Sequence, residues 1–290
     1  MPDDSRGSRS GRGSNASGDG SRRSAAAAEP PFSRARGDDR RFVPRSSVPR
    51  NAAAGPVRRR DRTEEQARYD GPPLAESITG KELDRAVAQQ LRGLPDKLAV
   101  RVARHLVAAG LLLDTDPQAA YQHTLAARGR AARIAVVREA CGEAAYAAGE
   151  YADALSELRA AKRMNGSQAY LAVLADCERA LGRPERALAL TRSPAVAGFE
   201  PALKAEVTIV EAGARRDLGE LDAALRTLEN APLRSQSRAD WVVRLRYAYA
   251  DTLLAAGRRG DALEWFHRTV AVDADEITDA ADRVGELELR

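Results

Sequence analysis

Four short segments of this chain share one pattern: a glycine, four residues of varied type, and then Ala-Leu. The segments begin at Gly149, Gly182, Gly219 and Gly257, so that successive glycines lie 33, 37 and 38 residues apart. Each glycine separates two runs of apolar residues at helical spacing, and glycine readily adopts the left-handed conformation that ends many helices. The alanine five residues later is small enough for two antiparallel helices to approach closely. The pattern therefore predicts a helix-turn-helix unit that is repeated four times.

The repeated unit resembles the tetratricopeptide repeat (TPR), a helical hairpin of about 34 residues. The most similar copy runs from Ala135 to Ser167, and the residues that carry the family spacing are Cys141, Gly142, Gly149, Tyr151, Ala154, Leu158 and Ala161. The later copies keep fewer of these residues, and the last has Thr269 where alanine is usual. The resemblance implies an all-α protein: a TPR-like α-solenoid, in which helical hairpins stack into a right-handed superhelix. An irregular helical bundle is the alternative.

The chain divides into two parts by composition. We expect residues 1–75 to be a disordered tail and residues 76–290 to be a helical repeat domain. Within the repeat domain the sequence predicts a lead-in helix at 79–92, hairpins at about 96–128, 131–166, 167–193, 200–231 and 237–272, and a capping helix at 275–289. A half-polar final helix of this kind would cover the last apolar face of a stack of repeats.

Local signals place some helix ends and loops. Thr79 and Glu82 have the spacing of a capping box, which predicts that the lead-in helix begins there. Asp116, followed by a proline, predicts the start of a second helix in the first hairpin. Because two of the repeat spacings are longer than the family's, we expect extended connections at Pro194–Pro201 and Pro232–Ser237.

The net charge of +4 is unevenly distributed. Residues 1–75 hold 16 arginines against 10 acidic residues, whereas the remaining residues hold 30 basic and 32 acidic residues. The tail combines arginine with Gly, Ser and Pro and has almost no large apolar residue, so burial cannot offset the entropy of ordering it. One interpretation is an arm that contacts the phosphates of RNA or DNA. The other is a solubilising leader whose arginine content reflects a GC-rich, actinobacterial type of genome.

No constellation of catalytic residues is present in the sequence. It contains no Gly-x-Gly-x-x-Gly, no phosphate-binding Gly-Lys-Ser/Thr and no Gly-x-Ser-x-Gly motif. The three histidines, His105, His123 and His267, are expected in different hairpins as packed or solvent-facing residues, so neither a metal site nor a cofactor is predicted. We interpret Cys141 and Cys177 as unreactive core thiols. An enzyme with an unrecognised composite site remains the third functional class.

The sequence also predicts a protein that lies outside the membrane, in the cytoplasm. The longest apolar stretch, Leu106–Leu113, is far shorter than a bilayer span, and the N-terminal residues carry no apolar segment typical of a secretory signal. No membrane partner is therefore predicted.

If the TPR register holds, the first helix of each hairpin lines a concave groove that suits an extended peptide or a partner helix. The predicted groove residues are Glu139, Glu143, Tyr146, Asp176, Arg179, Glu206, Arg216, Arg244, Tyr247 and Asp251. Tyr146 and Tyr247 are the large anchors, a residue type common in binding hot spots. Five of the eight charged positions are acidic, which favours a basic or mixed peptide. These residues therefore lack the cationic clamp of the family members that bind chaperone C-termini. The other interpretation is that these charges are simply solvated and bind no specific partner.

Together these patterns predict a non-enzymatic scaffold that holds a protein partner. The alternative, from another class, is an RNA- or ribosome-associated protein whose basic tail supplies the phosphate contacts. The opposite charges of the tail and the repeat domain also suggest that residues 1–75 fold back over the groove and compete with the partner. The sequence does not identify that partner.

Overall fold

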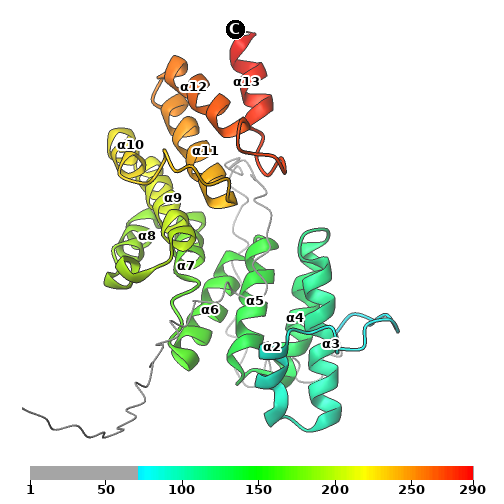
Figure 1. Ribbon diagram of the computed structural model, residues 1–290. Helices are drawn as coiled ribbons and strands as arrows, with labels where there is room; N and C mark the ends of the chain where they lie inside the picture. The colour runs from blue at the N-terminus through cyan, green and yellow to red at the C-terminus, as the bar shows by residue number, and fades with distance from the viewer. Residues whose placement is uncertain (1–70, 290) are drawn as a thin grey trace, which may run out of the picture.

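The computed structural model describes residues 71–289, and this range contains twelve α-helices, two short 3-10 helices and no strand (Figure 1). The α-helices are α2 (Arg85–Gln90), α3 (Asp96–Leu112), α4 (Pro117–Ala131), α5 (Ala135–Ala147), α6 (Tyr151–Asn165), α7 (Leu171–Ala180), α8 (Pro184–Thr191), α9 (Pro201–Asp217), α10 (Leu221–Glu229), α11 (Asp240–Ala255), α12 (Arg259–Val270) and α13 (Ala280–Glu288). The 3-10 helices are η1 (Leu91–Gly93) and η2 (Pro194–Gly198). The all-α prediction is thus confirmed for these residues, whereas nearly all of the predicted tail lies outside the described part.

The four glycines that define the repeat have the same backbone geometry. Gly149, Gly182, Gly219 and Gly257 have φ angles of 79°, 73°, 77° and 76°, the left-handed conformation expected after a helix. After each glycine, the next backbone N–H donates to the carbonyl five residues earlier, as Glu150 does to Ala145 at 2.8 Å. The other three turns make the equivalent bond at 2.9 Å. A residue with a Cβ would strain this conformation, which explains why glycine recurs there.

The alanine of each Ala-Leu pair lies where the two helices of its hairpin meet. Ala154, Ala187, Ala224 and Ala262 are all fully buried. Helices α5 and α6 also approach closely at Gly142, where an added Cβ would lie only 2.5 Å from Leu158 Cγ. Small residues therefore set the spacing of the paired helices, as the sequence pattern predicts.

Successive helices pack against one another in chain order. From α3 to α13 they follow a curved path, with the C-terminal helix at the opposite end of the molecule from α2 (Figure 1). First helices of neighbouring hairpins also touch: α7 contacts α9, and α9 contacts α11. The buried apolar residues form four clusters distributed along this path, and the cluster around Phe266, at 0% exposure, lies between α9 and α13.

The predicted start of the lead-in helix is wrong. Helix α2 begins at Arg85, where the Asp84 carboxylate accepts a hydrogen bond from the Ala86 N–H at 2.7 Å. Thr79 and Glu82 do bond to each other, at 2.8 Å between Thr79 Oγ1 and Glu82 Oε1, but they close a turn rather than cap a helix. The reason is Gly80, whose φ of 87° is incompatible with a helix.

The predicted capping helix at 275–289 also begins too early: α13 starts at Ala280, because the Asp273 carboxylate accepts from the Ile277 and Thr278 N–H groups and holds the preceding residues in a turn. The remaining predicted boundaries lie close to the observed ones. Asp116 Oδ1 accepts from the Ala119 N–H at 3.0 Å and caps α4 as expected. The connection from α8 to α9 contains η2, and the connection from α10 to α11 runs from residue 230 to 239. None of the helices of residues 71–289 is long and apolar enough to span a bilayer.

Candidate functional site

The ten predicted groove residues all lie on α5, α7, α9 and α11, the first helices of the four Gly-turn hairpins. Most of them are bonded within the protein. Side-chain hydrogen bonds join these helices to one another and to α13, and the residues involved are Tyr146, Asp176, Arg179, Glu206, Arg216, Asp217, Arg244, Tyr247, Asp251, Asp279 and Arg283. We call this set the inner network. It includes Asp217, Asp279 and Arg283, which the sequence did not single out.

The inner network links each first helix to the next one. The Tyr146 hydroxyl of α5 donates to Asp176 of α7 at 2.5 Å, and Arg179 of α7 donates to Asp217 of α9 at 2.8 Å. Arg179 also pairs with Asp176 at 2.8 Å within α7. Burial and the Asp176 carboxylate raise the pKa of Tyr146 well above its usual value, so the hydroxyl keeps its proton.

The second half of the network has the same form. The Asp251 carboxylate of α11 accepts hydrogen bonds from Arg216 of α9 at 2.7 Å and from Arg283 of α13 at 3.0 Å. One carboxylate thus joins three helices. Arg244 pairs with Glu206 at 2.7 Å between α11 and α9. The Tyr247 hydroxyl donates at 2.5 Å to Asp279, which directly precedes α13. The charges at the predicted groove positions are therefore mostly neutralised by partners from the neighbouring hairpin.

We expect Asp251→Ala to lower the free energy of unfolding by about 2 kcal/mol, because Arg216 and Arg283 would be left half-buried without a counter-ion. Asp261→Ala is the matched control, since Asp261 pairs with Arg258 within one exposed turn and should cost less than about 0.5 kcal/mol. Urea unfolding of both variants measures the difference. Equal losses would show that the carboxylate of Asp251 does not join the helices energetically.

Glu139 and Glu143 stand apart from the inner network. Asn165 donates to Glu139 Oε1 at 2.7 Å, and burial raises the pKa of Glu139. Both carboxylate oxygens of Glu143 are buried without a hydrogen-bond partner, and so is the hydroxyl of Tyr170. Burial raises the pKa of Glu143 to about 8, an effect that the nearby Tyr170 hydroxyl opposes and Glu139 strengthens. This buried carboxyl group beside the Tyr170 hydroxyl is the most unusual feature of the predicted groove.

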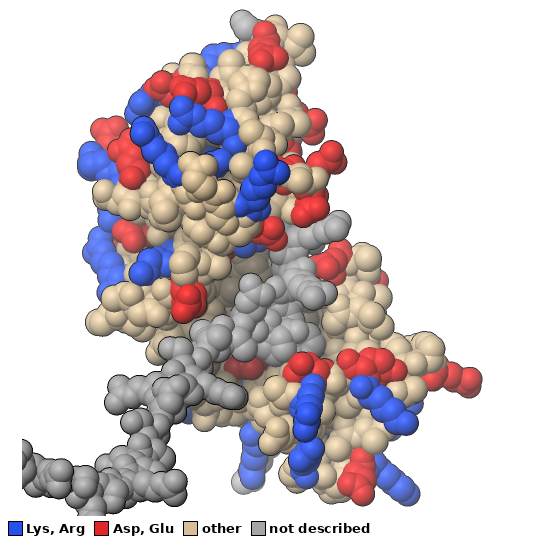
Figure 2. All heavy atoms as spheres, viewed as in Figure 1, with Lys and Arg blue, Asp and Glu red and all other residues tan. Residues whose placement is uncertain are grey.

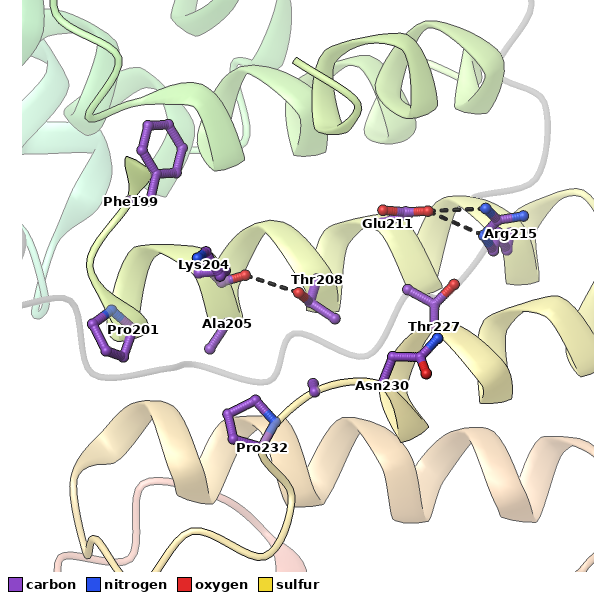
Figure 3. Close-up of a pocket in the computed structure, with 11 residues that line it drawn as sticks. Phe199, Pro201, Lys204, Ala205, Thr208, Glu211, Arg215, Thr227, Asn230 and Pro232 are labelled. Atoms are coloured by element: carbon purple, nitrogen blue, oxygen red, sulfur yellow. Dashed lines mark hydrogen bonds and ion pairs between the residues drawn. The ribbon is translucent and has the colours of Figure 1, made fainter. Parts of the chain in front are cut away.

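A separate cleft, which the sequence did not predict, lies between α9 and the end of α10 (Figure 3). Its volume is about 560 Å³, a size typical of ligand pockets. Lys204, Thr208, Glu211 and Arg215 of α9 face Thr227, Asn230 and Pro232 across it, with Phe199 at one end (Figure 3). Its charged groups already have partners in the protein: Lys204 donates to a backbone carbonyl at 3.2 Å, and Arg215 pairs with Glu211 at 2.9 Å. The charged groups of the cleft are therefore engaged within the protein.

His105 of α3 and His123 of α4 face each other within one hairpin, so the prediction that the histidines lie in different hairpins is wrong. Their Nδ1 atoms are 3.0 Å apart, which requires one neutral ring to donate and the other to accept. Burial lowers the pKa of His105 to about 4, with further contributions from His123, Arg130, Arg101 and Arg104. Among residues 71–289 no group of three or more His, Cys, Asp or Glu side chains is arranged to hold a metal ion.

Acid should destabilise the protein through this histidine pair. Because the pKa of His105 is 6.5 when unfolded and about 4 when folded, its stabilising effect is complete above pH 6.5 and is lost as the pH falls towards 4. The loss amounts to at most about 3 kcal/mol. His105→Asn cannot take up this proton and should lose less stability over that range in urea unfolding. His267→Gln, at an exposed position, should follow the wild type; identical pH profiles for all three proteins would rule out the effect.

The two cysteines are buried and unpaired, as predicted for core thiols. Burial raises the pKa of both Cys141 and Cys177 to about 12, so the reactive thiolate is strongly disfavoured at neutral pH.

No family model and no curated protein matches this chain. Function must therefore be inferred from the residues and their geometry. The described part offers a helical face crossed by the inner network, a buried carboxyl group at Glu143, and a cleft whose charged groups are paired within the protein.

Proposed function

We propose that residues 76–289 form a TPR-like α-solenoid that serves as a non-enzymatic scaffold and holds a protein partner on the face formed by α5, α7, α9 and α11. The observation that carries this proposal is the repetition of one turn. Gly149, Gly182, Gly219 and Gly257 share a left-handed φ and the same backbone hydrogen bond. Hairpins that repeat one geometry and pack in chain order present their first helices along a common side, which suits extended peptides.

The charges of this face favour a basic or mixed peptide. The arginines of the inner network are paired with carboxylates of the protein, whereas Glu139 and Glu143 have no cationic partner. A nucleic-acid interface would present a continuous positive patch. On the face seen in Figure 2, Lys and Arg are interspersed with Asp and Glu. The described residues thus support a protein partner rather than RNA.

The test is a charge exchange that preserves the internal ion pair. Partners would first be identified by cross-linking and affinity purification of the full-length protein from its native cell. In the double variant Glu206→Arg and Arg244→Glu, the pair joining α9 and α11 is retained but the charges on the face are exchanged. We expect partner affinity to fall at least tenfold with an unchanged melting temperature.

The matched control exchanges Glu264 and Arg268, an exposed pair within α12. This control should bind the partner as the wild type does. Equal binding by both double variants would contradict the proposed face, and salt-sensitive binding of RNA by the full-length protein in place of a protein partner would favour the alternative function.

A further inference from the structure

The cleft beside α9 faces away from the inner network. Glu206 belongs to the inner network, whereas Lys204 and Thr208, two residues before and after it, line the cleft. Two residues correspond to about 200° around an α-helix, so the cleft lies on the opposite side of α9 from the proposed partner face. A segment that fills the cleft therefore leaves that face open.

The cleft exists because the second helix of this hairpin is short. Helix α9 has 17 residues and α10 has nine, so α10 covers only about half of the length of α9. The chain after α10 lines one side of the cleft with Asn230 and Pro232, and the chain before α9 lines one end with Phe199. These two connections lie in the two longest repeat spacings, of 37 and 38 residues, so the cleft has the same origin as the irregular spacing.

One end of the cleft combines apolar side chains with a cation (Figure 3). Phe199, Pro201 and Pro232 supply the apolar lining. Lys204 lies beside them, and its ammonium group donates to the Ala197 carbonyl at 3.2 Å. No carboxylate of residues 71–289 pairs with this ammonium group. This end therefore suits an acidic group that is flanked by apolar residues.

The other end of the cleft offers a hydrogen-bond acceptor. Arg215 donates to Glu211 through Oε1 alone, at 2.9 and 3.3 Å, so that Glu211 Oε2 can accept from another donor. Thr227 and Asn230 line the same end, and the Asn230 amide can both donate and accept. Along α9 the cleft thus presents a cation and then, seven residues later, a carboxylate.

One segment of residues 1–70 has the complementary order of groups. Residues 29–34 read Glu-Pro-Pro-Phe-Ser-Arg. Two consecutive prolines favour an extended polyproline II backbone, which binds grooves lined by aromatic side chains. The other aromatic residues of this range fit less well: Phe42 follows two arginines, and Tyr69 is only two residues from Gly71, which lies against α3 and α4.

We propose that residues 29–34 of the same chain bind in this cleft. The Glu29 carboxylate accepts from Lys204, the Arg34 guanidinium donates to Glu211 Oε2, and the two prolines and the phenylalanine between them pack on the apolar lining. The inference goes beyond the scaffold function, because it places a segment of the chain on the side of α9 away from the partner.

The spacing of the charges and the length of the chain permit this contact. Glu29 and Arg34 are about 15 Å apart along a polyproline II helix, and Lys204 and Glu211 about 10 Å apart along α9. The long side chains of lysine and arginine span the difference. The 36 residues between Arg34 and Gly71 can extend to roughly 120 Å, several times the length of about 25 Å of α9.

Carbodiimide coupling of the full-length protein tests the contact directly, because this reagent joins a lysine amine to a carboxylate that touches it. The chain has ten acidic residues in residues 1–70 and four lysines in all, so Lys81, Lys97 and Lys162 serve as internal controls for Lys204. Mass spectrometry of the monomer band should find Glu29 coupled to Lys204 at least tenfold more often than to any other lysine.

Charge reversal tests the same pair by proteolysis of the full-length protein. Trypsin should cleave after Arg34 at least tenfold faster in Glu29→Lys and in Lys204→Glu than in the wild type, because each reversal replaces an attraction with a repulsion. The double variant restores the pair with opposite polarity and should return to the wild-type rate. Lys97→Glu, at an exposed residue of α3, is the matched control and should leave the rate unchanged. Because Pro30 follows, Glu29→Lys adds no trypsin site.

Coupling of Glu29 to the four lysines in equal amounts, or only between two copies of the chain, would overturn the proposal. So would cleavage after Arg34 at one rate in all five proteins, or a double variant that is cleaved as fast as the single variants. These outcomes would leave the scaffold function in place, because the exchange of Glu206 and Arg244 tests the inner face separately.

Discussion

Replacing Glu143 with glutamine is expected to raise the free energy of unfolding at pH 8 by up to about 5 kcal/mol and to change it little at pH 4.5. The carboxyl group is buried without a partner, and its pKa rises from 4.5 in the unfolded chain to about 8 in the folded one. Between these values Glu143 is protonated in the folded chain and ionised in the unfolded chain, so its own contribution to stability falls as the pH rises. Glutamine has no proton to release.

Urea unfolding between pH 4.5 and 8 measures this difference, with Glu150→Gln as the control that should follow the wild type. Parallel pH profiles for wild type and Glu143→Gln would show that the carboxylate is not buried alone.

Phe266→Ala should lower the free energy of unfolding by about 3 to 5 kcal/mol, the usual cost of removing a large ring from a packed core. Phe266 is fully buried at the centre of the C-terminal cluster. Its ring packs edge-on against Tyr247, with centroids 5.5 Å apart, and lies under the guanidinium of Arg283. The substitution would therefore disturb the contact between α11, α12 and α13 together.

Val270→Ala is the control for Phe266→Ala, because Val270 lies one turn later on the same helix and is 40% exposed. It should change stability by less than about 0.5 kcal/mol. Urea denaturation of both variants at neutral pH gives the comparison. A loss below 1 kcal/mol for Phe266→Ala would mean that the C-terminal cluster does not support the fold.

The turns and the helix pairs were predictable from the sequence because their causes are local. A left-handed residue requires glycine, as at Gly149, and a close helix contact requires a small residue, as at Ala154. Thr269, which stands where the TPR pattern has alanine, also has a local explanation. Its hydroxyl donates to the Trp265 carbonyl one turn earlier, so the buried residue stays satisfied within its own helix.

The side-chain partners were not predictable, because they depend on residues that lie 18 to 38 positions apart in the sequence. The register placed Tyr146 and Asp176 on first helices, yet only the folded arrangement of α5 and α7 shows that the two side chains bond to each other. The same holds for His105 and His123, whose approach depends on the crossing of α3 and α4. The misplaced lead-in helix has a different cause: Thr79 and Glu82 form the expected bond, but the backbone at Gly80 prevents a helix.

The inner network also determines how easily the stack of hairpins can flex. Its hydrogen bonds connect each first helix to the next, and α11 to α13. A change in the angle between neighbouring hairpins would therefore stretch a charged hydrogen bond at each of these contacts. A partner that requires a flatter or tighter surface would have to break such bonds and would bind more weakly for that reason. Selection among ligands would then act through the stiffness of the protein as much as through the residues that touch them.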